Sequence, residues 1–245
     1  MYLEYKKINS TLPFVSVLVP TCDRRIFIPQ LLHCYYSQTY PQDRMELIIA
    51  DDGQDPIHDL VEGKPGIKYL RLNEKITIGS KRNYLNDNAN GDIMVCMDDD
   101  DYYPPVRVAH AVEKLTNSDK LIAASSEMLI YFINKIGLFK SGPFHENHGS
   151  NATFAYKKEY LLNNRYDDTK TIAEEVSFTN NFTNLMIQLD SKSTILVIAH
   201  NTNTFDKENL IFLPSGELNP DFKKVSTAEL IINEKAFEFY KNMLH

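Results

Sequence analysis

The chain has 245 residues, 43% of them hydrophobic and 24% charged, which is ordinary for a globular protein with a sizeable core. Its net charge of -7 argues against a general nucleic-acid-binding protein, because such proteins usually carry a basic surface. No apolar run approaches the roughly 18 residues that a membrane-spanning helix needs, Met1–Lys7 lacks the pattern of a signal peptide, and the three cysteines include no C-x-x-C pair. We therefore expect a cytoplasmic protein with free thiols and no integral membrane segment.

The first half of the chain alternates strand and helix patterns. Residues 14–20 form a short β-branched run that ends at a proline, as is typical of a buried strand. A helix is expected from Pro29, because proline suits the first helical position and apolar side chains follow at helical spacing. A further helix is expected at 79–88, and further strands at 46–50, 67–72 and 92–97. This alternation predicts an α/β fold with a mostly parallel central sheet and helices on both faces.

Acidic residues gather where three of these strands end. Asp23 follows the first strand, Asp51 and Asp52 follow the second, and Asp98–Asp101 follow the strand at 92–97. In open parallel sheets, ligands bind beyond the carboxyl ends of the strands. The acidic residues are therefore candidates for a ligand site.

The second half of the chain is less regular. Residues 121–133 predict one or two strands, and 141–150 form a loop rich in Gly, Asn and His. Helices are expected near 157–162 and 174–185, a strand at 194–199, and a last helix after a capping-box pattern at Ser226–Glu229. No internal repeat or linker demands a boundary, so we expect a single domain over residues 1–245.

The strongest chemical signal is the run of four carboxylates at Asp98–Asp101. Adjacent carboxylates repel one another, and a divalent cation bound to a diphosphate would compensate them. Mg²⁺ and Mn²⁺ take one or two carboxylates and complete their shell with phosphate oxygens and water. A solvated acidic turn is the alternative interpretation of the run alone.

The flanks of this run carry a resemblance to a known family. The matching segments, in order, are Val15–Thr21, Ser37–Pro41, Ile49–Gly53, Thr77–Asn83, Ala89–Asp92 and Met97–Pro105. Together they closely resemble the nucleotide-sugar half of family 2 glycosyltransferases. The resemblance implies a glycosyltransferase A-type (GT-A) fold. It covers about residues 14–110 as the nucleotide-sugar-binding half, is looser over an acceptor-binding and catalytic half at about 111–205, and leaves a C-terminal extension with a helix at about 206–245.

The resemblance also implies roles on the donor side. The expected contacts with the base and ribose come from Pro20, Thr21, Asp23 and either Asp51 or Asp52. Lys81 and Arg82 would lie near the diphosphate, with structural salt bridging as the alternative. Asp100 is the best metal ligand, and Asp98 or Asp99 would hold the ribose or share the metal, with the register of the motif open by one residue. His200 would complete the metal shell or touch phosphate, and a surface histidine is the alternative.

The catalytic base is expected from the second half of the chain. Inverting transfer needs a carboxylate that takes the proton of the acceptor hydroxyl as that hydroxyl attacks. Ala173–Phe178 resembles the family's acidic pair at a helix start, which favours Glu175 as the base, with Glu174 second. Acidic residues that favour a helix N-terminus for electrostatic reasons are the alternative interpretation.

The resemblance thus implies an inverting glycosyltransferase assisted by Mn²⁺ or Mg²⁺. Its donor would be a nucleotide diphosphate sugar that carries a hexose or an N-acetylhexosamine, with uridine diphosphate favoured and guanosine diphosphate next. Its acceptor would be a hydroxyl of a glycan or a protein. A non-catalytic sugar-nucleotide or glycan-binding relative is one alternative. A sugar nucleotidyltransferase is less favoured, because Thr21–Arg25 lacks the glycine-rich loop that usually holds a triphosphate.

Overall fold

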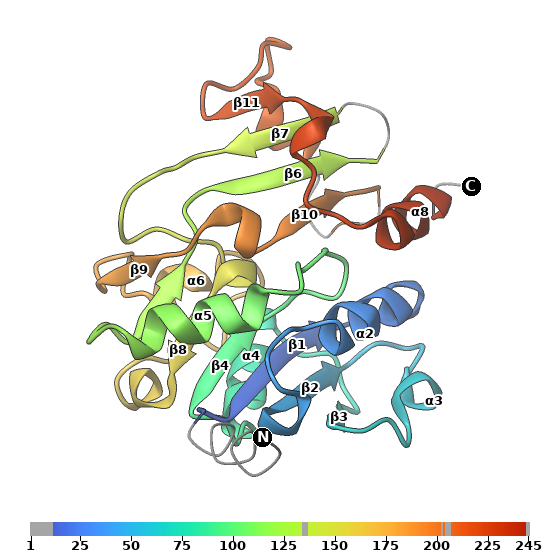
Figure 1. The fold of residues 1–245 in the computed structure, drawn as a ribbon, viewed down its shortest axis with the longest axis vertical. Helices are drawn as coiled ribbons and strands as arrows, with labels where there is room; N and C mark the ends of the chain where they lie inside the picture. The colour runs from blue at the N-terminus through green and yellow to red at the C-terminus, as the bar shows by residue number, and fades with distance from the viewer. Residues whose placement is uncertain (1–11, 134–136, 202, 204–206, 244–245) are drawn as a thin grey trace, which may run out of the picture.

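The structure is a computed structural model that describes residues 12–133, 137–201, 203 and 207–243 (Figure 1). The start of the chain, for which no signal peptide is expected, lies outside these residues. The described residues form two β-sheets with helices packed around the larger one. No helix among them is long and apolar enough to cross a membrane.

The larger sheet has seven strands in the order β3-β2-β1-β4-β8-β5-β9. Its strands are β1 (Val15–Thr21), β2 (Met45–Asp51), β3 (Ile67–Arg71), β4 (Ile93–Cys96), β5 (Ile122–Ala124), β8 (Ala155–Lys157) and β9 (Met186–Gln188). β1, β2, β3 and β4 are all parallel, and β8 alone runs antiparallel to its neighbours. The strand order reverses at β1, which lies between β2 and β4, and ligands bind at such reversals in α/β sheets. The predicted mostly parallel central sheet is confirmed.

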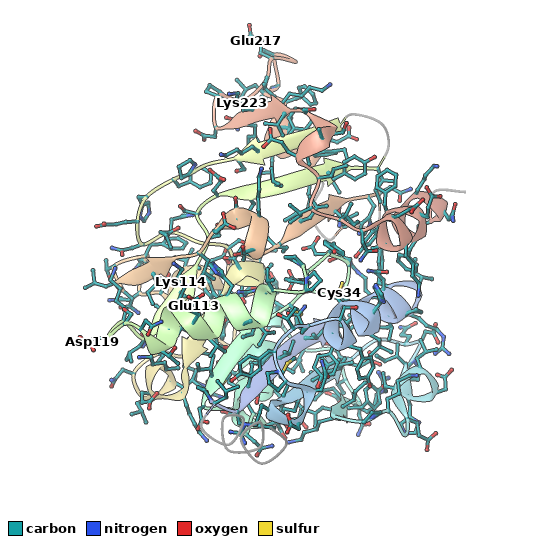
Figure 2. All side chains as sticks on the ribbon, in the orientation of Figure 1. Cys34, Glu113, Lys114, Asp119, Glu217 and Lys223 are labelled. Atoms are coloured by element: carbon teal, nitrogen blue, oxygen red, sulfur yellow. The ribbon has the colours of Figure 1, made fainter. Side chains whose placement is uncertain are left out.

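Helices cover both faces of this sheet. Successive side chains of a strand point to opposite faces, so Val17 and Leu18 of β1 enter different apolar clusters. The cluster of Val17 includes side chains of α2 (Ile28–Tyr36) and α5 (Arg107–Thr116), whereas that of Leu18 includes α4 (Ile78–Asp87). Glu113 and Lys114 lie on the exposed side of α5 (Figure 2). The two-faced packing that the sequence predicts is therefore present.

A second sheet has four strands in the order β10-β6-β7-β11. They are β6 (Met128–Phe132), β7 (Gly137–Ser141), β10 (Leu196–Ala199) and β11 (Phe222–Val225). Buried side chains of this sheet belong to the same apolar cluster as Val17, so one core joins the two sheets. The last helix, α8 (Glu234–Asn242), lies beside α2 (Figure 1), whereas Glu217 and Lys223 lie at the far end of the second sheet (Figure 2).

The helix expected over 174–185 is wrong in length. Only α6 (Glu175–Phe178) is helical, and three successive residues after it, Asn180, Asn181 and Phe182, have φ values of 51°, 55° and 58°. This left-handed conformation cannot continue a right-handed helix. The chain turns sharply here and then enters β9.

Several other elements also differ from those that the sequence patterns predicted. The strand signal at 121–133 splits into β5 and β6, which belong to different sheets. The expected helix near 157–162 is a short 3-10 turn, and Ser226 caps another such turn, whereas Asn233 caps α8. Strands β7, β8, β9 and β11 and helices α3, α5 and α7 were not predicted. The remaining short elements are α3 (His58–Val61), α7 (Glu208–Ile211) and 3-10 turns at Arg25–Phe27, Gln42–Arg44, Asn151–Thr153, Lys158–Leu162, Ser191–Ser193 and Thr227–Glu229.

The start of α4 is locked to a loop of the second half of the chain. The backbone N–H of Gly79 donates to the carbonyl of Lys170 at 3.1 Å, and the Asn83 amide donates to the carbonyl of Tyr166 at 2.8 Å. A Cβ atom on Gly79 would lie 2.0 Å from the carbonyl oxygen of Asp167. Glycine is therefore needed for this close approach, which holds the two halves of the chain together.

Gly79→Ala should therefore destabilise the protein, although alanine normally favours a helix by about 1 kcal/mol over glycine. Overpacking against a backbone carbonyl should lower the free energy of unfolding by about 1–3 kcal/mol, which corresponds to a fall in Tm of about 2–12 °C. Gly63→Ala is the control, because Gly63 has φ +70° and nothing within 4 Å, so only the cost of a left-handed alanine, about 1–2 kcal/mol, is paid. A Gly79→Ala protein as stable as wild type would contradict the contact.

Candidate active site

The acidic run follows β4 at the reversal of strand order, and its first two carboxylates face the larger sheet and α4. Asp98 accepts a hydrogen bond from Nη2 of Arg82 at 3.2 Å. Asp99 accepts one from the hydroxyl of Thr21, at the end of β1, at 2.6 Å. Burial raises the pKa of Asp98, and burial together with the charge of Asp100 raises the pKa of Asp99 to about 8.

Asp100 has the opposite electrostatic environment. It forms an ion pair with Arg24 and lies 3.2 Å from Nε2 of His200, and the amide of Asn203 donates to it at 3.1 Å. Burial alone would raise the pKa of Asp100, but the His200 contact and the charges of Arg24 and Lys207 outweigh it and lower this pKa. Asp100 is therefore the member of the run held most strongly as a carboxylate.

Asp101 joins the acidic run to the second sheet. Its Oδ1 accepts a hydrogen bond from the backbone N–H of Ile198 at 2.8 Å, within β10. The next residue, Tyr102, exchanges two backbone hydrogen bonds with Leu196 at 2.9 and 3.1 Å. These contacts fix the end of β10, and they bring His200 to Asp100.

A buried ion pair lies at the ends of β1 and β2. The Lys81 ammonium of α4 pairs with Asp52 and donates to the carbonyl of Thr21 at 3.0 Å. The backbone N–H of Ile76 donates to the other oxygen of Asp52 at 3.0 Å. Burial opposes ionisation of Asp52, but these hydrogen bonds lower its pKa overall, whereas burial and Asp52 raise the pKa of the neighbouring Cys22 thiol to about 11. All three cysteines are free thiols, as expected.

Neighbouring protein groups use almost all of the hydrogen-bonding capacity of the Asp51 carboxylate. One oxygen accepts from the N–H of Gly53 at 2.9 Å, and the other accepts from the hydroxyl of Tyr69 at 2.7 Å and from the N–H of Ile57 at 3.2 Å. Its side chain is 1% exposed. Asp51 therefore shapes the turn after β2, and of the two expected base-contacting acids Asp52 lies nearer the other site residues.

Asp23 is exposed, and it lies just beyond the end of β1, beside the turn that follows β2. Its carboxylate accepts from the backbone N–H groups of Gln54 and Asp55, which lowers its pKa. A Cβ on Gly53 would lie 2.4 Å from the backbone nitrogen of Asp23, so glycine is required between these two turns. Pro20 lies inside β1 and is buried, opposite Ala50 of β2.

The acidic pair at α6 divides into a paired and an unpaired carboxylate. Glu174 is 6% exposed and accepts a hydrogen bond from Nε of Arg82 at 2.7 Å. Glu175 is half-buried and receives no hydrogen bond from another described side chain. Burial and the adjacent charge of Glu174 raise the pKa of Glu175. Arg82 therefore bridges Asp98 and Glu174, and this bridge draws the start of α6 to the acidic run.

The residues expected to bind a metal are brought together only in part. Asp100 and His200 face each other, but Asp98 is turned toward Arg82. Within the described residues, no three His, Cys, Asp or Glu side chains converge as a metal site. Two protein donors still suit Mg²⁺ or Mn²⁺, which usually complete their shells with phosphate oxygens and water. The donor set therefore fits a metal that arrives with a diphosphate.

Sequence reasoning assigned no role to Arg24 and Asn203, which both contact Asp100. Arg24 lies three residues beyond the end of β1, where the strand order reverses, and this position is the signal that could have identified it. Asn203 follows β10 and has no such signal. Only the pairing of β10 with Tyr102 brings it to the acidic run.

The first half of the chain is similar to a known protein family. Residues 16–131 match the family described as Glycosyl transferase family 2. The probable glycosyltransferase YdaM of Bacillus subtilis is 27% identical over 148 residues, which cover 54% of this chain and 35% of that protein. Glycosyltransferase AglE of Haloferax volcanii is 30% identical over 97 residues, which cover 38% of this chain and 32% of that protein. The chain matches only about a third of the length of these relatives.

Solved structures share the fold at low sequence identity. The mannosyltransferase PcManGT from Pyrobaculum calidifontis, in complex with GDP-Man and Mn²⁺, has a TM-score of 0.63 and 18% identity, over 80% of this chain and 59% of that one. Residues 1-349 of S. aureus TarS, in complex with UDP-GlcNAc, give a TM-score of 0.57 and 19% identity, over 77% of this chain and 59% of that one. The fold is therefore of the GT-A type.

Because Arg82 neutralises the buried Glu174 and the half-buried Asp98, Arg82→Met should be more harmful than loss of either carboxylate. Removing one partner of a buried ion pair typically costs about 3–5 kcal/mol, and Glu174→Gln should cost less because Arg82 keeps Asp98. The free energy of unfolding in urea would measure both changes. Arg165→Met is the matched control, because its pair with Asp87 is exposed and should contribute at most about 1 kcal/mol. Equal losses for the two arginine variants would contradict the bridging role.

Proposed function

Residues 16–131 belong to glycosyl transferase family 2, and from this premise we propose that the chain moves a hexose or an N-acetylhexosamine from a nucleotide diphosphate sugar to an acceptor hydroxyl, with inversion. A uridine diphosphate donor is favoured, with guanosine diphosphate next, and the acceptor is a glycan or a protein. The observation that carries the proposal is the Arg82 bridge. It joins Asp98 of the acidic run to Glu174, and so it brings the half-buried Glu175 to the same site.

The donor would bind across the ends of β1, β2 and β4. For the base and ribose, the pair of Lys81 and Asp52 offers a hydrogen-bond donor beside a hydrogen-bond acceptor, next to the backbone of Thr21. Asp100 and His200 would hold a divalent cation, which when bound neutralises charge on the leaving diphosphate. In this proposal Asp99 and Asp98 line the ribose side, and Asp23 lies just beyond the end of β1.

Glu175 would act as the catalytic base and Glu174 as its positioning partner. As the acceptor oxygen forms its bond to the anomeric carbon, the bond from that carbon to the diphosphate oxygen breaks, and the carboxylate of Glu175 takes the hydroxyl proton. A base for this step must be ionised but not tightly paired. The raised pKa of Glu175 makes its carboxylate a stronger proton acceptor once it is ionised, whereas Glu174 is tightly paired with Arg82, and both observations support this division of roles.

Metal-dependent binding of a nucleoside diphosphate is the first expected outcome. At a hundred times its Kd, a ligand stabilises a protein by about 2.7 kcal/mol, which for a chain of this size raises Tm by about 5–11 °C. Thermal unfolding with each nucleoside diphosphate, with and without Mn²⁺, would measure this increase. We expect one diphosphate to give a larger increase with Mn²⁺, and Asp100→Asn to lose the part that depends on Mn²⁺.

Asp119→Asn is the control for this substitution, because Asp119 is exposed in the loop after α5 (Figure 2) and should leave the Mn²⁺ effect intact. A full Mn²⁺-dependent increase in Asp100→Asn would show that another acid of the run is the ligand. No increase with any diphosphate would argue against donor binding.

The pH dependence of the transfer reaction distinguishes the proposed role of Glu175 from that of Glu174. Transfer should rise with pH as Glu175 loses its proton, and this rise should lie above the ordinary range for a glutamate because its pKa is raised. Glu174→Gln removes the neighbouring negative charge, lowers the pKa of Glu175, and should move the rise to lower pH. Glu175→Gln should reduce transfer by about 100-fold or more. The readout is release of nucleoside diphosphate from the donor that stabilises the protein.

Both variants should keep the Tm increase with the nucleoside diphosphate, because neither side chain is assigned to nucleotide binding. Near-normal transfer in Glu175→Gln together with its loss in Glu174→Gln would reverse the two assignments. Loss of nucleotide binding in Glu175→Gln would point to a structural role.

A further inference from the structure

Four aromatic rings gather beside the turn that follows α6. Phe144, His145 and His148 come from the loop after β7, and Phe182 comes from the turn after α6. The centroid of the His148 ring lies 4.8 Å from those of both Phe144 and Phe182, and it stacks on the Phe182 ring with an angle of 29° between their planes. His145 lies 5.4 Å from His148 and 6.0 Å from Phe182. We call these four side chains the ring cluster.

The ring cluster is open to solvent on one side. Phe144 is 43% exposed, His145 is exposed, and His148 and Phe182 are partly exposed. A stable fold usually buries a phenylalanine ring, so an exposed group of ring faces points to a ligand that covers them.

The turn that presents Phe182 is strained and is tied to the proposed base. Left-handed φ values at three successive non-glycine residues are costly and persist only where the surroundings impose them. Here the backbone N–H of Phe182 donates to the hydroxyl of Thr179 at 3.2 Å, and that hydroxyl donates to the carbonyl of Glu175 at 2.7 Å. Thr179 is fully buried. One buried hydroxyl therefore connects the backbone of Glu175 to the backbone of Phe182.

The histidine side of the cluster is also held in place. The amide of Gln188 in β9 donates to the carbonyls of Glu146 and His148, at 2.8 and 3.0 Å. Nδ1 of His148 is buried and has no hydrogen-bond partner within the described residues. Burial, followed by the charge of His145, lowers the pKa of His148, so its ring is neutral near pH 7. A neutral ring can offer its face to an uncharged ligand.

We propose that the ring cluster is a stacking platform for a pyranose ring of a glycan acceptor, with the exposed amides of Asn180 and Asn181 beside it for the sugar hydroxyls. The C–H groups of a pyranose face are weakly electropositive, and aromatic faces carry negative potential. Apolar ring faces with a few polar groups are the usual composition of a small-ligand site. The inference rests on the proposed function, because the hydroxyl of Thr179 joins the turn that carries Phe182 to the backbone of the proposed base, Glu175.

Binding of simple methyl glycosides tests the platform without any transfer reaction. The imidazole signals of His145 and His148 in the full chain, assigned with His145→Gln and His148→Gln, would be followed by NMR. The probes are methyl glycosides of glucose, galactose, mannose and N-acetylglucosamine. At least one should shift both signals. Phe182→Ala should bind that glycoside about fivefold more weakly, because one ring–ligand contact is lost, while Phe182→Tyr should bind it as wild type.

Leu218→Ala is the matched control, because Leu218 is an apolar side chain that is 41% exposed on a loop of the second sheet. It should leave the titration unchanged. If Phe182→Ala does not fold, His145→Ala serves in its place, with the His148 signal as the readout, because His145 is exposed.

Two results would overturn the inference. One is that no methyl glycoside shifts the two signals, or that Phe182→Ala binds as wild type. The other is that the serine peptide Gly-Ser-Gly shifts the signals and no glycoside does, which would favour a protein acceptor. Failure of the proposed function is distinguishable, because nucleoside diphosphates would then leave Tm unchanged while the glycosides still shift the histidine signals.

Discussion

Four adjacent carboxylates at the end of one strand must each find a separate partner, and the structure is arranged around this constraint. Charges this close cannot all ionise in a buried place unless cations and donors approach from different directions. The run from Asp98 to Asp101 meets that condition only for Asp100: the four carboxylates point at different elements, but burial raises the pKa of Asp98, Asp99 and Asp101. Their pKa values diverge as a result, to about 8 for Asp99 and below the ordinary range for Asp100.

This division of partners also holds the two halves of the chain together. Asp98 reaches α6 through Arg82, and Asp101 fixes β10 through the backbone of Ile198. The donor-side acids and the acceptor-side elements thereby become parts of one site. The proposed transfer would need such a junction, because the donor's anomeric carbon, the acceptor hydroxyl and the base would have to meet at one point.

Local patterns predicted most of the larger sheet and several residues of the site. Apolar runs and the turns after them indicated β1 and β2. The acids beyond these strands were predicted to form a ligand site, because ligands bind beyond the carboxyl ends of the strands in parallel sheets. The patterns failed where tertiary contacts outweighed local preference. The turn at Phe182 is left-handed although its neighbours suggested a helix, and β11 contains two lysines that obscure the strand pattern.

The sequence by itself determined the fold class, the positions of the main strands along the chain and the position of the acidic run, because these depend on periodicity and on neighbouring residues. Only the tertiary structure decided which carboxylate faces which partner. Asp99 lies 78 residues from Thr21, Asp101 lies 97 from Ile198, and Asp100 lies 103 from Asn203 along the chain. Contacts at such separations are set by sheet pairing and packing, which short-range patterns do not contain.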